Sequence, residues 1–149
     1  MVNIVVQDTV FAIDPTATQT EIKQGWKIVD YKLPNKAIRY LWGAHARQVA
    51  ESPQPAFVIT PVNCQLADFA LIRLKEKKQY RKFPSPNLVE CDMHRIDLDF
   101  AKIEMVGENK YRVQPLLPLP AGEYIWVNTM GKPLNNFGDV EVYPFTIEK

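Results

Sequence analysis

Hydrophobic and polar residues alternate along several short segments of the chain, with the period of two that is typical of half-buried β-strands. The clearest case is residues 95–100, where apolar residues occupy the even positions from Ile96 to Phe100. Beyond this segment they occupy the odd positions from Ala101 to Met105, and this shift of one residue predicts a β-bulge. Comparable patterns predict strands at residues 26–31, 38–42, 56–60, 69–75, 111–113, 124–128 and 140–147.

Turn signals separate these segments. Residues 107–110, Gly-Glu-Asn-Lys, are typical of a hairpin turn that leads into the strand at 111–113. Pro144 interrupts the last strand, and because proline has no N–H to donate we expect an edge strand or a bulge there. Two short helices are also expected. One covers residues 14–25, which begin with the capping pair Asp-Pro and end with Gly, and the other covers residues 45–51.

The number and spacing of the strands predict the fold class. Twelve prolines distributed along the 149 residues disfavour long helices, because proline does not fit in helix interiors. Many short strands with turns between them are typical of a sandwich or a barrel. We expect an all-β fold, a single two-sheet antiparallel sandwich spanning residues 1–149 with at most one or two short helices. A chain of this length buries enough apolar surface to fold without a disulfide or a metal ion.

Composition and charge narrow the range of partners. Apolar residues make up 46% of the chain and the formal net charge is +1, so no overall electrostatic field attracts nucleic acid or an anionic membrane. No apolar run approaches the roughly 20 residues of a membrane-spanning helix, and the first residues lack the pattern of a signal peptide. The chain is therefore expected to be either cytoplasmic or the mature part of an exported protein with an added Met.

Potential metal ligands are present without the spacing of a metal site. Cys91 and His94 form a Cys-x-x-His pair, and Cys64 and His45 lie elsewhere, but no second close pair completes a zinc site. We therefore expect no metal. Cys64 and Cys91 are either joined in a disulfide or present as two buried thiols, and the sequence leaves both alternatives open.

Carboxylates and nucleophiles are no better arranged for chemistry. Asp97 and Asp99 share one face of a predicted strand and Asp92 lies nearby, but calcium takes six or more oxygen ligands and no glycine-rich loop supplies them. A nucleophilic pair of Cys91 and His94 is disfavoured because a strand directs these two side chains to opposite faces. We expect no catalytic and no cofactor-binding residues.

The strongest local charge pattern is a basic hairpin over residues 73–82. Six cationic residues surround Tyr80: Arg73, Lys75, Lys77, Lys78, Arg81 and Lys82. Such a hairpin can bind phosphates and stack a base, which makes it a candidate for binding polyanions or nucleic acid. Solvated lysines that protect a sheet edge from pairing produce the same pattern, and the near-neutral net charge favours that second interpretation.

Aromatic residues suggest a further binding hypothesis. Trp26, Trp42 and Trp126 could line a sugar-binding surface. Their positions in alternating strands place most of them in the core, and an exposed pair of aromatics would be needed to support the hypothesis.

One stretch resembles a known family. Residues 116–127 read Leu-Leu-Pro-Leu-Pro-Ala-Gly-Glu-Tyr-Ile-Trp-Val and are followed by a Phe-x-Ile strand at residues 145–147. This is similar to the closing hairpin of bacterial extracytoplasmic immunoglobulin-like accessory domains, where a proline such as Pro120 presets a turn and a glycine such as Gly122 supplies a positive φ. The resemblance implies an immunoglobulin-like sandwich and an extracytoplasmic location. Copper binding is not implied, because residues 128–133 lack the Asp-Gly-His stretch and residue 1 is Met instead of His.

Together these observations favour a non-enzymatic binding or accessory module. Sandwich domains carry their sites on loops, and the longest loop candidates are residues 82–95 and 128–139. The second contains Phe137, which either contacts a protein partner or covers an edge of the sandwich. A polyanion or nucleic-acid binder acting through residues 73–82 is the alternative. The candidate interaction residues are Arg73, Lys75, Lys77, Arg81 and Phe137.

Overall fold

The computed structural model describes residues 1–6, 9–23, 27–28, 31–32, 36–84, 95–96, 101–128 and 141–148. Regular structure in these ranges is β-strand, apart from one short 3-10 helix, η1 (Leu66–Asp68). The all-β class predicted from the sequence is therefore confirmed. No helix in the described ranges is long and apolar enough to cross a membrane.

Two sheets contain most of the strands. The first sheet has the order β13-β14-β9-β1-β2, with every neighbouring pair antiparallel. Its strands are β1 (Val2–Val6), β2 (Thr9–Ala12), β9 (Ala56–Ile59), β13 (Ala101–Gly107) and β14 (Lys110–Pro115). The second sheet has the order β10-β15-β16-β3, and β8 also pairs with β16, in the parallel direction. Its strands are β3 (Thr16–Ala17), β8 (Val49–Ala50), β10 (Phe69–Arg73), β15 (Gly122–Asn128) and β16 (Glu141–Ile147).

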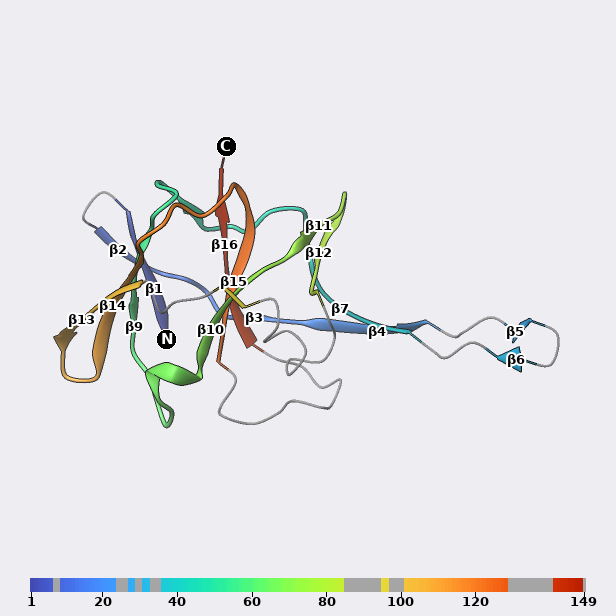
Figure 1. Cartoon of the computed structure of the whole chain (residues 1–149), viewed down its shortest axis with the longest axis horizontal. Coiled ribbons are helices and arrows are strands. Elements are labelled where there is room, and N and C mark those ends of the chain that lie inside the picture. Colours follow the sequence, from blue (N-terminus) through green and yellow to red (C-terminus); the bar gives the residue numbers. More distant parts are fainter. Residues whose placement is uncertain are drawn as a thin grey trace.

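These two sheets face each other across the main hydrophobic core (Figure 1). The first sheet contributes Ile4 and Phe57, and the second contributes Leu71, Trp126 and Phe145, all of them buried. The ring of Phe57 meets the ring of Trp126 edge-on, with 5.4 Å between centroids and 74° between planes. Side chains from both sheets therefore form one apolar layer, which is where the alternating strands direct their apolar faces.

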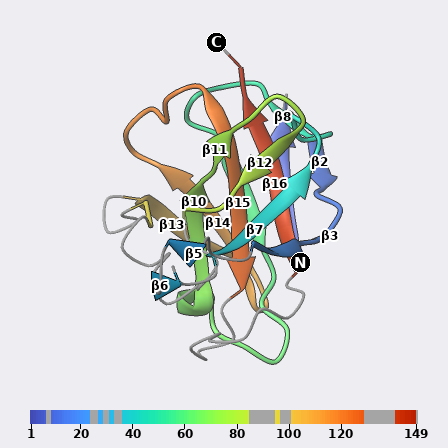
Figure 2. The same ribbon diagram turned by 90° about the vertical axis from the view of Figure 1, so that its right-hand side faces the viewer.

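A third sheet covers the other side of the second sheet (Figure 2). Its order is β11-β12-β7-β4, with bounds β11 (Lys75–Glu76), β12 (Tyr80–Lys82), β7 (Lys36–Trp42) and β4 (Gln19–Lys23). A second apolar cluster joins the two sheets, in which Leu41, Leu74 and Phe83 pack with Ile72 and Val127. The second sheet is therefore buried on both of its faces.

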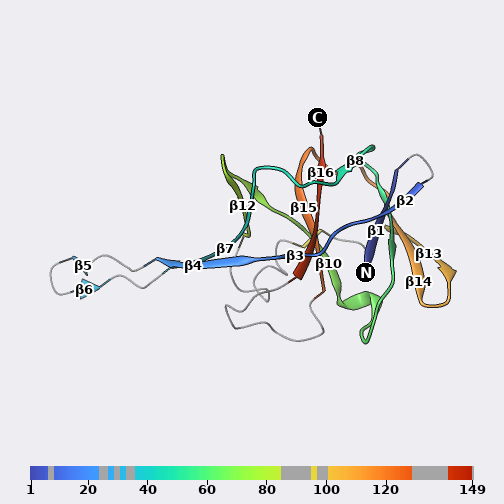
Figure 3. The ribbon, with the colours of Figure 1, turned by 180° about the vertical axis from the view of Figure 1, so that it is seen from behind.

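Strands β4 and β7 also form an arm that extends away from the three stacked sheets. The short pair β5 (Lys27–Ile28) and β6 (Tyr31–Lys32) lies at its outer end. Figure 3 shows the arm on one side of the molecule and β13 and β14 on the other. Tyr40 and Trp42 lie on β7, where this arm joins the body.

Several local expectations agree with the structure. Strands occupy the predicted segments at 38–42, 56–59, 69–73, 111–113, 124–128 and 141–147. The two-residue turn Glu108-Asn109 joins β13 to β14, with Asn109 at φ 54° and a register shift between Met105 and Gly107. Pro144 lies in the interval between the part of β16 that pairs with β3 and the part that pairs with β8. Its missing N–H therefore interrupts no ladder on that edge.

Both predicted helices are wrong. Residues 16–23 of the first contain β3 and β4, and residues 45–51 of the second consist of bends and β8. Asp14 and Pro15 are favourable at a helix start, but the segment that follows pairs with β16 and then with β7. Tertiary pairing thus overrides the capping signal.

Two other local expectations need correction or lie outside the described residues. The sequence predicts a positive φ at Gly122, and this is wrong. Among the described glycines, the one with a positive φ is Gly43. A Cβ at Gly122 would lie 3.0 Å from Nε of Arg73, so this glycine makes room for the guanidinium. The bulge expected after Phe100 falls at residues 97–101, of which 97–100 lie outside the described ranges.

Candidate binding face

The outward face of the third sheet carries both aromatic and cationic side chains. Tyr80 pairs with Trp42, and Lys82 pairs with both Tyr40 and Lys75. Directly paired residues project to the same side of a sheet, and so do residues two apart on one strand. These five side chains therefore share one face, which we call the aromatic face.

Three rings form the centre of the aromatic face. Tyr40 meets Trp42 edge-on, with 5.1 Å between centroids and 85° between planes, and it meets Tyr80 at 5.5 Å and 66°. Trp42 keeps 63% of its surface exposed, which is exceptional for the largest apolar side chain. The rings line a hollow of about 140 Å³ together with Ile38 and Glu21. An indole supported from one side by a tyrosine offers a fixed flat surface to a ligand.

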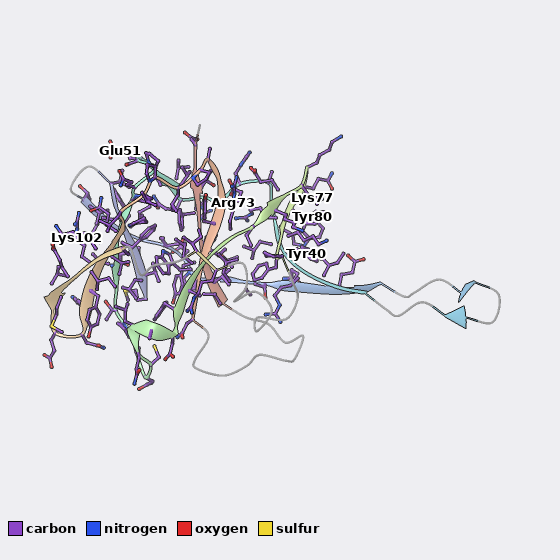
Figure 4. The ribbon with its side chains drawn as sticks, viewed as in Figure 1. Tyr40, Glu51, Arg73, Lys77, Tyr80 and Lys102 are labelled. Atoms are coloured by element: carbon purple, nitrogen blue, oxygen red, sulfur yellow. The ribbon has the colours of Figure 1, made fainter. Side chains whose placement is uncertain are left out.

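Lysines border the rings on the hairpin side. Lys75 and Lys77 are exposed, and the N–H of Lys77 donates to the carbonyl of Tyr80 at 3.0 Å, which closes the hairpin. Figure 4 shows Lys77, Tyr80 and Tyr40 in succession along one side of the body. Arg73 lies nearer the middle of the molecule in this view, and Lys102 lies at the far end.

The inward face of the same strands is closed by a buried arginine. Arg81 is 4% exposed, and its guanidinium donates to the carbonyls of Gly43 and Trp42 at 3.0 and 2.8 Å. Gly43 adopts φ 89°, a conformation that favours glycine and turns the chain just after Trp42. Burial lowers the pKa of Arg81, while the carboxylate of Glu123, 4.0 Å away, acts to raise it. Arg81 therefore anchors the end of β7 that carries Trp42.

The five interaction residues predicted from the sequence do not lie together in the structure. Lys75 and Lys77 lie beside the aromatic face, whereas Arg81 is inside the protein and is not available to a ligand on that face. Arg73 donates to the carbonyl of Ala121 at 2.9 Å and lies over the ring of Tyr124. Phe137, and all of the predicted loop 128–139 except Asn128, lie outside the described residues.

Most of the residues considered for metal binding also lie outside the described ranges. These are Cys91, Asp92, His94, Asp97 and Asp99. Cys64 accepts a hydrogen bond from Nδ2 of Asn128 at 3.4 Å, whereas Nδ1 of His45 lies 3.2 Å from Oε2 of Glu123. The two described members of the hypothetical zinc set therefore contact different parts of the protein.

Sequence reasoning did not identify Tyr40 and Trp42 as site residues. The sequence places Ile38, Tyr40 and Trp42 on one face of a strand, and its alternating strands predict a core position for most of the tryptophans. The buried side is instead formed by Leu41 and its neighbours. Adjacent residues of a strand point to opposite faces, so the polar neighbour of Tyr40, Arg39, gives no sign that Tyr40 is exposed, and Arg39 itself is buried.

Comparison with protein-family models, with curated proteins and with solved structures finds no match.

Proposed function

We propose that the chain is a non-enzymatic binding module built on an immunoglobulin-like β-sandwich. The strand order supports this assignment. Strands β13, β14 and β9 are neighbours in one sheet, and β10, β15 and β16 are neighbours in the sheet that faces it. Strand β8 runs parallel to β16, as in that architecture. The Oη of Tyr124 donates to the carbonyl of Pro120 at 2.6 Å, near the start of β15. This contact is typical of the tyrosine corner found in such sandwiches. It falls within the stretch that resembles bacterial immunoglobulin-like accessory domains.

The ligand that fits the aromatic face best is single-stranded nucleic acid. The observation that carries this proposal is the exposed ring of Trp42 beside Tyr40, bordered by Lys75 and Lys77. Single-stranded nucleic acid combines ring faces that stack on aromatics with phosphates that attract lysines. The net charge of +1 does not oppose binding at one face, because salt screens charges beyond roughly 8–10 Å.

A binding experiment with two variants tests the proposal. We expect the parent protein to bind a fluorescent oligothymidylate, measured by anisotropy at several salt concentrations. Trp42→Ala should weaken binding by about 5- to 150-fold, because stacking of one base on an aromatic contributes about 1–3 kcal/mol. Removing both charges with Lys75→Gln and Lys77→Gln should reduce the slope of log affinity against log salt by about 0.7 for each lysine.

Matched controls are available elsewhere on the surface. Phe11 is an exposed aromatic on β2 and Lys102 is an exposed lysine on β13, so Phe11→Ala and Lys102→Gln should bind as the parent does. Equal binding by the Trp42→Ala variant and the parent would rule out the aromatic face. The protein could instead bind a neutral oligosaccharide, with an affinity that does not depend on salt and is lost in Trp42→Ala. That result would confirm the aromatic face as a binding site but identify its ligand as a sugar and not nucleic acid.

A further inference from the structure

A second cluster of polar side chains lies on the other side of the basic hairpin, around Glu123. Donor atoms of His45, Glu76 and Glu123 all lie within 4.8 Å of one another. They come from three separate segments, namely the bends after β7, strand β11 and strand β15. Glu123 is 1% exposed, which is a rare environment for a carboxylate without strong partners.

The two oxygens of Glu123 have different roles. Oε1 accepts hydrogen bonds from the backbone N–H of Ala46 at 2.9 Å and from the hydroxyl of Thr146 at 2.8 Å. Oε2 lies 3.2 Å from Nδ1 of His45. Carboxylates that bind metal ions are likewise held in place by hydrogen bonds from surrounding groups.

The spacing also fits a small divalent ion. Two ligands about 2.0–2.2 Å from a tetrahedral zinc ion lie roughly 3.3 Å apart, close to the separation of Nδ1 and Oε2. A hollow of about 420 Å³ lined by His45, Glu76, Glu123 and Thr146 leaves room for water on the open side. Histidine and carboxylate together are ligands that zinc accepts in sites with an open fourth position.

An independent observation points to an added oxygen at this cluster. Among the described residues, Nη1 of Arg81 is buried and donates to no hydrogen-bond acceptor, and its ion-pair partner, Oε1 of Glu123, lies 4.0 Å away. A buried N–H without an acceptor is costly. A water molecule or an anion that completes the coordination of a metal ion would supply one. The contact of Arg81 is to Oε1, so Oε2 is left for the ion.

We propose that His45, Glu76 and Glu123 form a binding site for a divalent transition-metal ion of the zinc class, which ties the hairpin β11-β12 to β15. The carboxylates of Glu76 and Glu123 supply the negative charge that attracts a cation to the site. The three ligands are distant in the sequence, and no short motif could reveal them. This proposal is independent of the ligand of the aromatic face.

Metal titration of the chelator-treated protein tests the site directly. We expect one Co²⁺ per chain to produce visible d–d absorption bands, Zn²⁺ to displace it, and Zn²⁺ to raise the melting temperature. His45→Ala and Glu76→Gln should each weaken Zn²⁺ binding by tenfold or more. Both residues are exposed, so these variants are expected to fold.

Glu104→Gln provides the control, because Glu104 is an exposed carboxylate on β13 that pairs with Lys102 at 2.9 Å. This variant should bind Co²⁺ and Zn²⁺ as the parent does. The proposal is overturned if the parent shows neither cobalt bands nor a zinc-dependent rise in melting temperature. It is equally overturned if the His45→Ala and Glu76→Gln variants bind both ions with the affinity of the parent.

Discussion

At the scale of single residues, Arg81 shows how one side chain can connect two parts of the molecule. Its guanidinium contacts the carbonyls that end β7 and approaches the carboxylate of Glu123 in β15. From the sequence it was one cation among six in a basic hairpin. The alternation of Tyr80, Arg81 and Lys82 separates two faces, but all three side chains are amphipathic, so the sequence does not say which face packs inward.

Replacing Arg81 by Ala should destabilise the protein by about 3–5 kcal/mol, because Glu123 loses its buried cationic partner and the carbonyls of Trp42 and Gly43 lose their donors. The change should also weaken ligand binding at Trp42, whose carbonyl loses its donor. Urea unfolding followed by circular dichroism measures the first effect, and anisotropy measures the second. Arg81→Lys should lie between the parent and Arg81→Ala, since lysine keeps the charge but lacks the planar fork. A loss below 1 kcal/mol in Arg81→Ala would contradict an anchoring role.

Tyr124 supports a prediction on pH. Tyr124→Phe should cost about 1 kcal/mol near neutral pH, because the carbonyl of Pro120 loses its donor. Burial raises the pKa of the Tyr124 phenol in the folded protein above its ordinary value of about 10, although Arg73 opposes this. The folded state therefore holds the proton more tightly than the unfolded state. The contribution of the Tyr124 phenol to the free energy of unfolding is therefore complete below about pH 10 and declines as the pH rises through the folded-state pKa.

The stability gap between the parent and Tyr124→Phe should thus narrow above about pH 10. Melting temperatures of both proteins from pH 7 to 11 provide the measurement. Tyr111→Phe is the matched control, because no hydrogen bond of its hydroxyl is seen in the described part of the chain. A difference in melting temperature that widened as the pH rose would have the opposite sign and would contradict a raised pKa of Tyr124.

At the scale of elements, the β13-β14 hairpin links turn chemistry to packing between loops. Asn109 takes φ 54° in its two-residue turn, and its Nδ2 donates to the carbonyl of Pro61, in the loop after β9. The residue therefore meets two requirements. Its backbone must adopt a left-handed conformation, and its side chain must reach a neighbouring loop.

Two substitutions separate these requirements. Asn109→Gly keeps the backbone conformation and loses the hydrogen bond, so it should cost about 0.5–1.5 kcal/mol. Asn109→Ala loses both and should cost roughly 1 kcal/mol more, because alanine is strained at positive φ. Chemical denaturation of the two variants and the parent gives the comparison. Equal stability of the Gly and Ala variants would show that the turn conformation is unimportant.

Individual strands were predictable from the sequence, whereas their partners were not. The period of two marked β7 and β14 because each has one more deeply buried face, whereas β9 is marked by a continuous apolar run. Residues 16–23 were assigned to a helix, because a local capping signal carries no information about pairing with β16 and β7. The candidate site shows the same limit. Lys75 and Lys77 were found from charge alone, but the aromatic face depends on the register between β7 and β12.

At the scale of the whole molecule, three stacked sheets place β15 in the middle layer. Tyr124 and Trp126 point into the first core and Ile125 and Val127 into the second, so the strand has no solvated side. This explains why residues 122–127 do not alternate between buried and exposed. A strand covered on both faces appears as a continuous apolar run, even in an antiparallel sheet.

The double burial of β15 has a consequence for how backbone amides exchange with deuterium. Exchange requires each hydrogen bond to open, and the free energy of opening varies across a structure. Amides of β15 are paired with β10 on one side and β16 on the other, so loosening either outer sheet alone leaves them protected. Mass spectrometry should find the slowest exchange in peptides covering residues 122–128, at rates set by global unfolding. Strands β2 and β13, which lie at sheet edges and have largely exposed side chains, should exchange first by local fraying.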